Sequence, residues 1–265
     1  MNAAISAKRL DLKNRLRTRK RTLAAWTSIG HPSITEIFAQ MKVDFVGIDI
    51  EHSTISLEQS QRIIETCQAH GVSCLPRIAS HNGERIKRLL DAGADGLIVP
   101  MVNTASEAEK IVAWSKYPTL GIRNYGVSRA QNYGFEFDSY TKSWNDSSSV
   151  IIQIESIEAV KNVESMLANP HIDAAMIGPY DISGSLGIPG QIDHPKVTEA
   201  CAKVIEVCKK MGKGCGTQVV DPDQASVEAK FGAGFTFVVL SSDIFLMWKW
   251  AERMREIVGT QRART

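Results

Sequence analysis

The sequence predicts a (β/α)₈ TIM barrel, a closed ring of eight parallel strands with helices around it. Eight short runs are apolar throughout, which is typical of parallel strands covered on both faces. Helical patterns separate the runs, and 265 residues suit one barrel, which usually has about 250. We expect one domain over residues 1–265 rather than an open doubly wound sheet, because no Gly-x-Gly-x-x-Gly follows the first run. The runs are Thr22–Ile29, Phe45–Glu51, Ser73–Ala79, Gly96–Val102, Val150–Ser156, Ala174–Gly178, Gly214–Val220 and Phe235–Ser241.

The helical segments between these runs carry start and stop signals. His70-Gly71 and Ala92-Gly93 are typical helix ends, whereas His194-Pro195 and Asp221-Pro222-Asp223 are typical starts. A first helix within residues 1–21 is expected to bury apolar residues and to turn its basic residues to solvent. The expected helices include Leu57–His70, Arg85–Ala92, Ser106–Trp114, Pro195–Met211 and a C-terminal helix, Asp243–Val258. The inward residues of the first helix are expected to be Ile5, Leu10, Leu12, Leu16 and Leu23.

One connection is too long for an ordinary loop. Residues 116–149 lie between the fourth and fifth runs and include the Gly121-Ile-Arg123 turn and several aromatic residues. We expect short helices that lie over the barrel mouth or form an oligomer contact. The segment is not a domain boundary, because the series of strands continues beyond it.

Composition excludes several classes of protein. Hydrophobic residues make up 43% and charged residues 23%, and the net charge is +2, so neither disorder nor a nucleic-acid partner is indicated. No apolar run approaches the ~20 residues that cross a bilayer, which argues against a membrane protein. The five cysteines form no Cys-x-x-Cys pair, so reduced, mostly buried thiols in a cytoplasmic protein are expected.

Two carboxylates suggest a metal site. Glu155 ends the fifth run and Asp181 follows the sixth, and the carboxyl ends of barrel strands are where active sites form. Two such oxygen donors suit a hard divalent cation, with positions left for water and substrate. The alternative is that both acids only cap the helices that follow. Between them, Gly178 and Pro179 allow the backbone to approach a ligand closely.

Other polar residues converge on the same end of the barrel. The second run ends in Asp49-Ile-Glu51-His52, where His52 is suited to act as a general base and Asp49 could fix its tautomer. Arg77, inside an apolar strand, is costly to bury unless it meets an anion such as a 2-oxo acid or a core carboxylate. Gln153 points to the same side of its strand as Glu155.

Several blocks resemble one family. The sequence is similar to the HpcH/HpaI class II pyruvate-dependent aldolases, such as 4-hydroxy-2-oxoheptanedioate and 2-keto-3-deoxy sugar-acid aldolases. The similarity extends from about Trp26 to the C-terminal helix. The blocks are Phe45-Val-Gly-Ile-Asp-Ile-Glu-His52, Leu75-Pro-Arg77, Leu97-Ile-Val-Pro-Met-Val102, Gln153-Ile-Glu155 and Ile177-Gly-Pro-Tyr-Asp-Ile-Ser-Gly-Ser-Leu-Gly187.

The resemblance implies a reaction and a set of residues. It implies reversible cleavage of a 4-hydroxy-2-oxo acid to pyruvate and an aldehyde, with Mg²⁺, Mn²⁺ or Co²⁺ on Glu155 and Asp181. His52 would be the base, supported by Asp49, and Arg77 would bind the substrate carbonyl. Asp91 would act from a neighbouring subunit of a homohexamer whose dimers exchange the last helix. The implied substrate-binding residues are Trp26, Arg77, Arg123, Gln153, Gly178 and Pro179.

The sequence departs from the family pattern at one position, and two alternative functions remain open. The family usually has Gly-x-Arg-Gly where this chain has Asn124 after Arg123, and asparagine tolerates a left-handed turn. A lyase acting on acyl-CoA esters would need a basic groove, for which Arg123 and Arg129 are the candidates. A catalytically silent barrel is the third possibility. Schiff-base chemistry is disfavoured, because no predicted strand ends in lysine.

Overall fold

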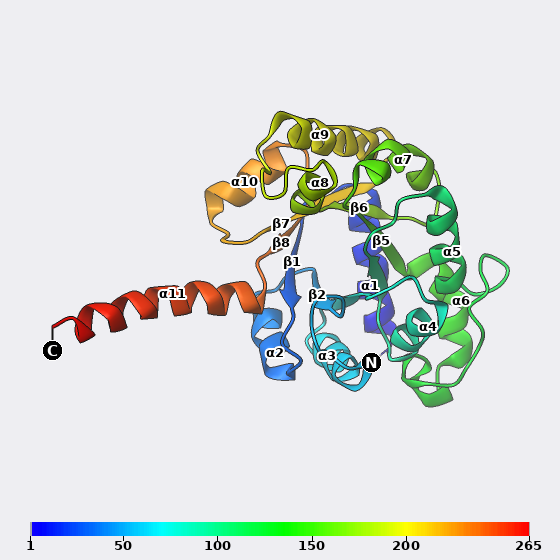
Figure 1. Cartoon of the computed structure of the whole chain (residues 1–265). Helices are drawn as coiled ribbons and strands as arrows, with labels where there is room; N and C mark the ends of the chain where they lie inside the picture. Colours follow the sequence, from blue (N-terminus) through cyan, green and yellow to red (C-terminus); the bar gives the residue numbers. More distant parts are fainter. Residues whose placement is uncertain (1, 265) are drawn as a thin grey trace.

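The computed structural model describes residues 2–264 and confirms the closed parallel barrel. Each strand pairs with the next along the chain, and β8 closes on β1 (Figure 1). Each observed strand ends one to three residues before its predicted end. They are β1 (Thr22–Thr27), β2 (Phe45–Asp49), β3 (Ser73–Arg77), β4 (Gly96–Val99), β5 (Ser149–Ile154), β6 (Ala174–Ile177), β7 (Gly214–Val219) and β8 (Phe237–Leu240).

Helices surround the barrel, and the predicted ends at Gly71 and Gly93 are confirmed, since both glycines have positive φ. His194 and Asp223 cap the helices that they were predicted to start. The helices are α1 (Asn2–Arg17), α2 (Pro32–Gln40), α3 (Leu57–Ala69), α4 (Gly83–Asp91), α5 (Ala105–Ser115), α6 (Phe137–Ser147), α7 (Ile157–Leu167), α8 (Pro179–Ser185), α9 (Pro195–Lys210), α10 (Gln224–Gly232) and α11 (Asp243–Arg262), with a 3₁₀ segment, η1 (Arg129–Gly134). No helix within residues 2–264 is both long and apolar enough to span a bilayer.

Two apolar layers hold the barrel together. The outer layer lies between strands and helices, and a smaller cluster fills the inside of the barrel. Leu12 and Leu16 of α1 belong to the inner cluster, together with Phe45 and Phe237. Helix α1 therefore closes the amino-terminal end of the barrel, and only the opposite end is open for a site.

The prediction of a fully solvated basic face on α1 is wrong for two residues. Arg9 and Lys13 are each only 3% exposed, whereas Leu10, expected to point inward, is 43% exposed. Arg9 pairs with Asp95 (Nε–Oδ1 3.1 Å), and Lys13 pairs with Asp173 (Nζ–Oδ1 3.0 Å). The carboxylates at the amino ends of the strands supply the partners that make this burial tolerable.

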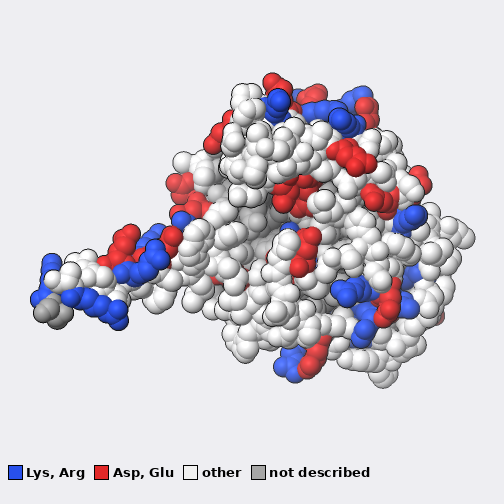
Figure 2. All heavy atoms as spheres, in the orientation of Figure 1, with Lys and Arg blue, Asp and Glu red and all other residues white. Residues whose placement is uncertain are grey.

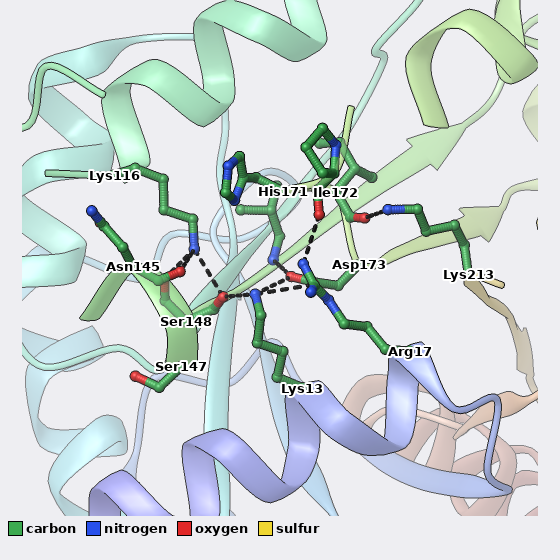
Figure 3. Close-up of polar contacts among 12 residues, drawn as sticks. Lys13, Arg17, Lys116, Asn145, Ser147, Ser148, His171, Ile172, Asp173 and Lys213 are labelled. Atoms are coloured by element: carbon green, nitrogen blue, oxygen red, sulfur yellow. Dashed lines mark hydrogen bonds and ion pairs between the residues drawn. The ribbon is translucent and has the colours of Figure 1, made fainter. Parts of the chain in front are cut away.

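Asp173 is the centre of this buried network (Figure 3). Its carboxylate accepts hydrogen bonds from Lys13, from Arg17 and from the backbone N–H of Val150. Lys116 lies beside this group and donates from Nζ to the backbone oxygens of Asn145 and Ser148 and to the Ser148 hydroxyl. A fourth cation, Lys213, lies nearby and donates from Nζ to the backbone carbonyls of Asn169 and Ile172.

The buried Lys116 is expected to make stability depend on pH. Burial, with the nearby charge of Lys13, lowers the pKa of Lys116 to about 7. In the unfolded chain this amine stays protonated to about pH 10.4. Between these values the unfolded state binds more protons, so the free energy of unfolding is expected to rise with pH, by up to about 1.4 kcal/mol per unit.

Urea denaturation from about pH 7 to about pH 8.5 measures this dependence. The Lys116→Met variant should give a flatter profile than the unchanged protein. Lys209→Met, at an exposed lysine of α9, is the matched control and should keep the original slope. Identical slopes for the protein and Lys116→Met would contradict the assigned effect.

The long connection between β4 and β5 does not lie over the mouth, contrary to one of the two expectations. It contains η1, which packs on α4, and α6, which packs on α1. Asn124 is exposed, and within residues 116–148 the left-handed non-glycine residues are Asn132 and Tyr133 instead.

Helix α11 extends away from the barrel (Figure 1). It is four residues longer than predicted, and in this single chain it leaves a large apolar surface in solvent. Its exposed apolar residues are Ile244, Leu246, Met247, Trp248, Trp250, Ile257 and Val258. The five cysteines are free thiols, four of them buried, as predicted.

Candidate active site

A pocket of about 330 Å³ opens at the carboxyl ends of the strands. Figure 2 shows the surface hollowed at the centre of this face, with acidic side chains beside the hollow. The pocket brings together six of the predicted site residues: Trp26, Asp49, His52, Arg77, Glu155 and Asp181. The other lining residues are Ser28, Gln218, Ser242, Ile244 and Phe245.

Glu155 directly follows β5 and points into the pocket rather than capping α7. The helix cap is Ser156, whose hydroxyl accepts from the N–H of Ala159. Glu155 accepts from the backbone N–H of Met101 (2.9 Å) and from Nε2 of Gln153 (3.0 Å). Burial raises the pKa of Glu155 to about 7, and the nearby carboxylates of Asp181 and Glu51 act in the same direction.

Asp181 lies in the first turn of α8, not at the end of a strand as predicted. It does not cap this helix, because the N-cap is Gly178, which has no side chain. A methyl group at Gly178 would lie 3.1 Å from Asp181 Oδ2 and 3.3 Å from Glu155 Oε1. Gly178 thus leaves open the space on which the two carboxylates converge.

Asp49 and Arg77 form a buried ion pair on the other side of the pocket. Asp49 accepts from Arg77 Nε (3.2 Å) and Nη2 (2.8 Å), and the guanidinium lies over the Trp26 ring, 5.1 Å from its centroid. Glu51 Oε2 is 3.3 Å from Arg77 Nε. These contacts fix the plane of the guanidinium. Arg77 pairs with a carboxylate, as one of the two predictions had it, and it also lines the pocket, where the other placed it.

His52 lies at the rim, and its contacts differ from the expected ones. Asp49 accepts from the backbone N–H of His52 (3.0 Å), so it orders the turn rather than the imidazole. The imidazole Nε2 lies 3.7 Å from Glu51 Oε2, and the side chain is 72% exposed. Burial raises the pKa of Glu51, with Arg77 and His52 opposing the shift. Glu51, not Asp49, is therefore the carboxylate that faces the imidazole.

The Glu155–Asp181 pair fits a divalent cation. Both donors are carboxylate oxygens, which hard cations prefer. Burial is the main cause of the raised pKa of Glu155, with Asp181 and Glu51 adding to the shift and Arg77 opposing it. Within residues 2–264 no group of three or more His, Cys, Asp or Glu side chains is placed to hold a metal ion. A cation here would take two protein ligands and leave its other positions to water and substrate.

The structure does not bring Arg123 and Asp91 to this pocket. The Arg123 side chain is fully buried, donates from Nη2 to Asp91 Oδ1 (2.7 Å) and lies over the rings of Tyr117 and Trp144. Its predicted contact with substrate finds no support within this chain. Asp91 lines a separate surface pocket beside Arg129 and Tyr133, so its predicted role in a neighbouring subunit stays a prediction.

Sequence reasoning missed several residues of the site. Gln218 is an amide near the end of an apolar strand, the same signal that identified Gln153. Ser28 and Ser242 follow strand ends and could have been found by the same argument. The sequence could not identify Met101 as a site residue, because its contribution is a backbone N–H held in a left-handed conformation with φ 52°.

The fold and the pocket define a TIM-barrel protein with acidic groups, an arginine and a histidine at the mouth of the barrel. The model of the HpcH/HpaI aldolase/citrate lyase family matches residues 23–249, and the chain belongs to this family. The chain is 32% identical to a 2-keto-3-deoxy-L-rhamnonate aldolase of Salmonella typhi, covering 92% of this chain and 91% of the relative.

Two further proteins show the same likeness. A hydroxypyruvate/pyruvate aldolase of Sagittula stellata is 32% identical over 88% of this chain and 94% of its own. The crystal structure of an HpcH/HpaI aldolase/citrate lyase family protein from Burkholderia cenocepacia superposes with a TM-score of 0.87 at 29% identity. It covers 94% of this chain and 99% of that one. The chain is therefore an enzyme of a carbon–carbon lyase family whose relatives are named as aldolases.

Proposed function

We propose that this protein reversibly cleaves a 4-hydroxy-2-oxo acid to pyruvate and an aldehyde, with a divalent cation held by Glu155 and Asp181. The observation that carries the proposal is the convergence of these two carboxylates on the space beside Gly178, in one pocket with Arg77. The cation, Mg²⁺, Mn²⁺ or Co²⁺, would supply Lewis-acid stabilisation of the negative charge that develops on the 2-oxo group. The rest of the chemistry is assigned to side chains of the chain itself.

Arg77 is proposed to bind the substrate oxygen that becomes negative as the C3–C4 bond breaks. Its hydrogen bonds to Asp49 use Nε and Nη2, so Nη1 is the nitrogen that this ion pair leaves for the substrate. A cation whose orientation is fixed before the reaction stabilises developing charge without having to reorganise. Asp49 and Trp26 act as positioning residues for this group.

His52 is proposed to remove the 4-hydroxyl proton in cleavage, directly or through one water. Glu51 beside Nε2 would orient the imidazole. General-base catalysis contributes typically about 10²–10⁴ in rate, so His52→Ala should lower kcat by about that factor and leave metal affinity nearly unchanged. Steady-state assays with metal titration test this. Thr54→Ala, exposed in the same loop, is the matched control, and an unchanged kcat for His52→Ala would refute the role.

The acyl-CoA alternative finds less support. Arg77 is the one Lys or Arg among the described lining residues of the pocket. Arg123 is buried, and Arg129 pairs with Glu65, so neither forms a basic groove for a nucleotide at the mouth. We therefore favour a free 2-oxo acid as the substrate.

Pyruvate release from a panel of 4-hydroxy-2-oxo acids, with and without EDTA, tests the proposed function. The expected result is release that EDTA abolishes and a divalent cation restores. Release that persists in EDTA and is trapped by borohydride would instead indicate a Schiff base. No release from any substrate would favour the silent barrel.

We also propose that α11 packs against a second copy of the chain, within a hexamer built from dimers. The exposed tryptophans Trp248 (50%) and Trp250 (57%) make an apolar surface that a lone chain would leave in water. Ile244 and Phe245, at the start of the same helix, line the pocket, so assembly and site are connected.

Trp250→Glu tests this assembly. A buried carboxylate without a partner would weaken the contact, so the variant should elute as a smaller species and lose activity. Light scattering after size exclusion gives the mass. Glu256→Gln, on the same helix, is the control and should keep the original mass. A Trp250→Glu protein of unchanged mass would contradict a role of α11 in assembly.

A further inference from the structure

His81 lies in the loop between β3 and α4 and reaches the end of the neighbouring strand. Its imidazole Nε2 lies 2.7 Å from the backbone oxygen of Pro100, the residue that directly follows β4. Because a carbonyl oxygen can only accept, Nε2 carries a proton and donates in this hydrogen bond. The half-buried imidazole therefore ties the ends of β3 and β4 together at the mouth of the barrel.

The peptide group that joins Pro100 to Met101 connects this contact with Glu155. Its C=O accepts from His81, and its N–H donates to Glu155 Oε2 (2.9 Å). The C=O and the N–H of a trans peptide lie in one rigid plane and point in opposite directions. His81 and Glu155 thus hold the two sides of the same group, so a rotation of this group would break both hydrogen bonds.

Met101 needs such support, because its backbone conformation is unfavourable. Its φ of 52° lies in the left-handed region, which is costly for a residue with a side chain. The peptide group after Met101 is held as well: Asn103 Nδ2 donates to the Met101 carbonyl (3.1 Å), and Asn103 Oδ1 accepts from the Ser156 hydroxyl. Hydrogen bonds on both sides of Met101 offset the strain, and His81 supplies one of them.

The orientation of this peptide group determines how Glu155 presents its carboxylate. Oε2 is held by the Met101 N–H, whereas Oε1 lies toward the space beside Gly178, 3.3 Å from a methyl group placed there. If the peptide group turned over, the Pro100 oxygen would face the carboxylate, and two acceptors cannot form a hydrogen bond. The His81 contact opposes this rotation and so keeps Oε1 on the side of the shared space.

We propose that His81 is a positioning residue for Glu155 and acts through the Pro100–Met101 peptide group. The proposal rests on the proposed function, in which Glu155 holds a divalent cation. Removal of a group that orients a metal ligand typically lowers metal affinity by about 10–100-fold. Donation to the Pro100 carbonyl also polarises the peptide group and strengthens its N–H as a donor. His81 transfers no proton in this account, and His52 keeps that role.

Three substitutions separate hydrogen-bond donation from packing. Glutamine places an N–H near the position of Nε2, asparagine places it one bond short, and leucine has none. Mn²⁺ binding followed by electron paramagnetic resonance should be about tenfold weaker in His81→Leu and His81→Asn, and close to that of the unchanged protein in His81→Gln. Ser80→Ala, exposed in the same loop, is the matched control and should bind Mn²⁺ as the unchanged protein does.

A second measurement needs neither metal nor substrate. Hydrogen exchange in the metal-free protein, followed by mass spectrometry of the peptide that contains Met101, reports whether its N–H stays bound to Glu155. Exchange should be faster in His81→Leu and His81→Asn than in the unchanged protein, and His81→Gln should keep the slow exchange. This result does not depend on activity.

Three results would overturn the inference. The first is an unchanged Mn²⁺ affinity in His81→Leu, and the second is equal behaviour of the glutamine and asparagine variants. The third is a weakened affinity with unchanged exchange at Met101, because the effect would then not pass through this peptide group. Failure of the proposed function is distinct: the unchanged protein would bind no Mn²⁺, while exchange at Met101 would still show whether His81 holds the peptide group.

Discussion

Replacing Glu155 by glutamine is expected to lower kcat/KM for pyruvate-forming cleavage by about 10³-fold. This factor corresponds to a loss of about 4 kcal/mol in the stabilisation of negative charge in the transition state. The substitution keeps the size of the side chain and removes its charge. A neutral amide beside Asp181 is a poor ligand for a hard cation, so the metal should be lost as well. The N–H of Met101 can still donate to the amide oxygen, and Gln153 can turn its own amide so that its oxygen accepts from the new NH₂ group.

Two measurements separate this effect from simple misfolding. Mn²⁺ binding followed by electron paramagnetic resonance should be weakened in Glu155→Gln, while the melting temperature should not fall. Glu158→Gln, in the exposed first turn of the following helix, is the matched control and should behave as the unchanged protein. Tight Mn²⁺ binding by Glu155→Gln would refute the assignment of Glu155 as a ligand.

Replacing Asp173 by asparagine should cause the largest loss of stability, about 3–5 kcal/mol, because it removes the negative partner from a buried group of cations. The Asp173 side chain is fully buried and pairs with Lys13 and with Arg17 (Nε–Oδ1 2.6 Å). It also accepts from the N–H of Val150 (2.9 Å), so it connects the starts of β5 and β6. An asparagine keeps one acceptor and no charge.

Chemical denaturation measures this loss. Asp11→Asn, in an exposed pair with Arg15 on α1, is the matched control and should change the free energy of unfolding by no more than about 0.5 kcal/mol. An equally small effect in Asp173→Asn would show that the cations are neutralised by other means. Activity per folded molecule should survive, because Asp173 lies at the closed end of the barrel.

The barrel itself was predictable from sequence because its signals are local. Each strand is a short apolar run, and glycines end the helices where a positive φ is required, as at Gly71 and Gly93. The strand ends were less predictable. The apolar pattern continues past the last paired residue, so Asp181 was expected at a strand end and lies in the first turn of α8.

Long-range pairing explains the other differences. Arg9 and Lys13 look solvated on a helix considered alone, and only the closed barrel supplies Asp95 and Asp173 as partners. Arg123 was expected at the mouth, but Asp91 and a group of aromatic rings bury it beside α4. Met101 contributes a backbone N–H from a strained turn, and no residue pattern predicts a contact of this kind.

The exchange of the C3 protons of pyruvate with D₂O, followed by proton NMR, tests the central proposal most directly, because it needs no aldehyde. The expected result is exchange that stops when EDTA removes the metal and returns when Mg²⁺, Mn²⁺ or Co²⁺ is added. Exchange that continues in EDTA, together with loss of activity when borohydride is added with pyruvate, would contradict a metal site on Glu155 and Asp181.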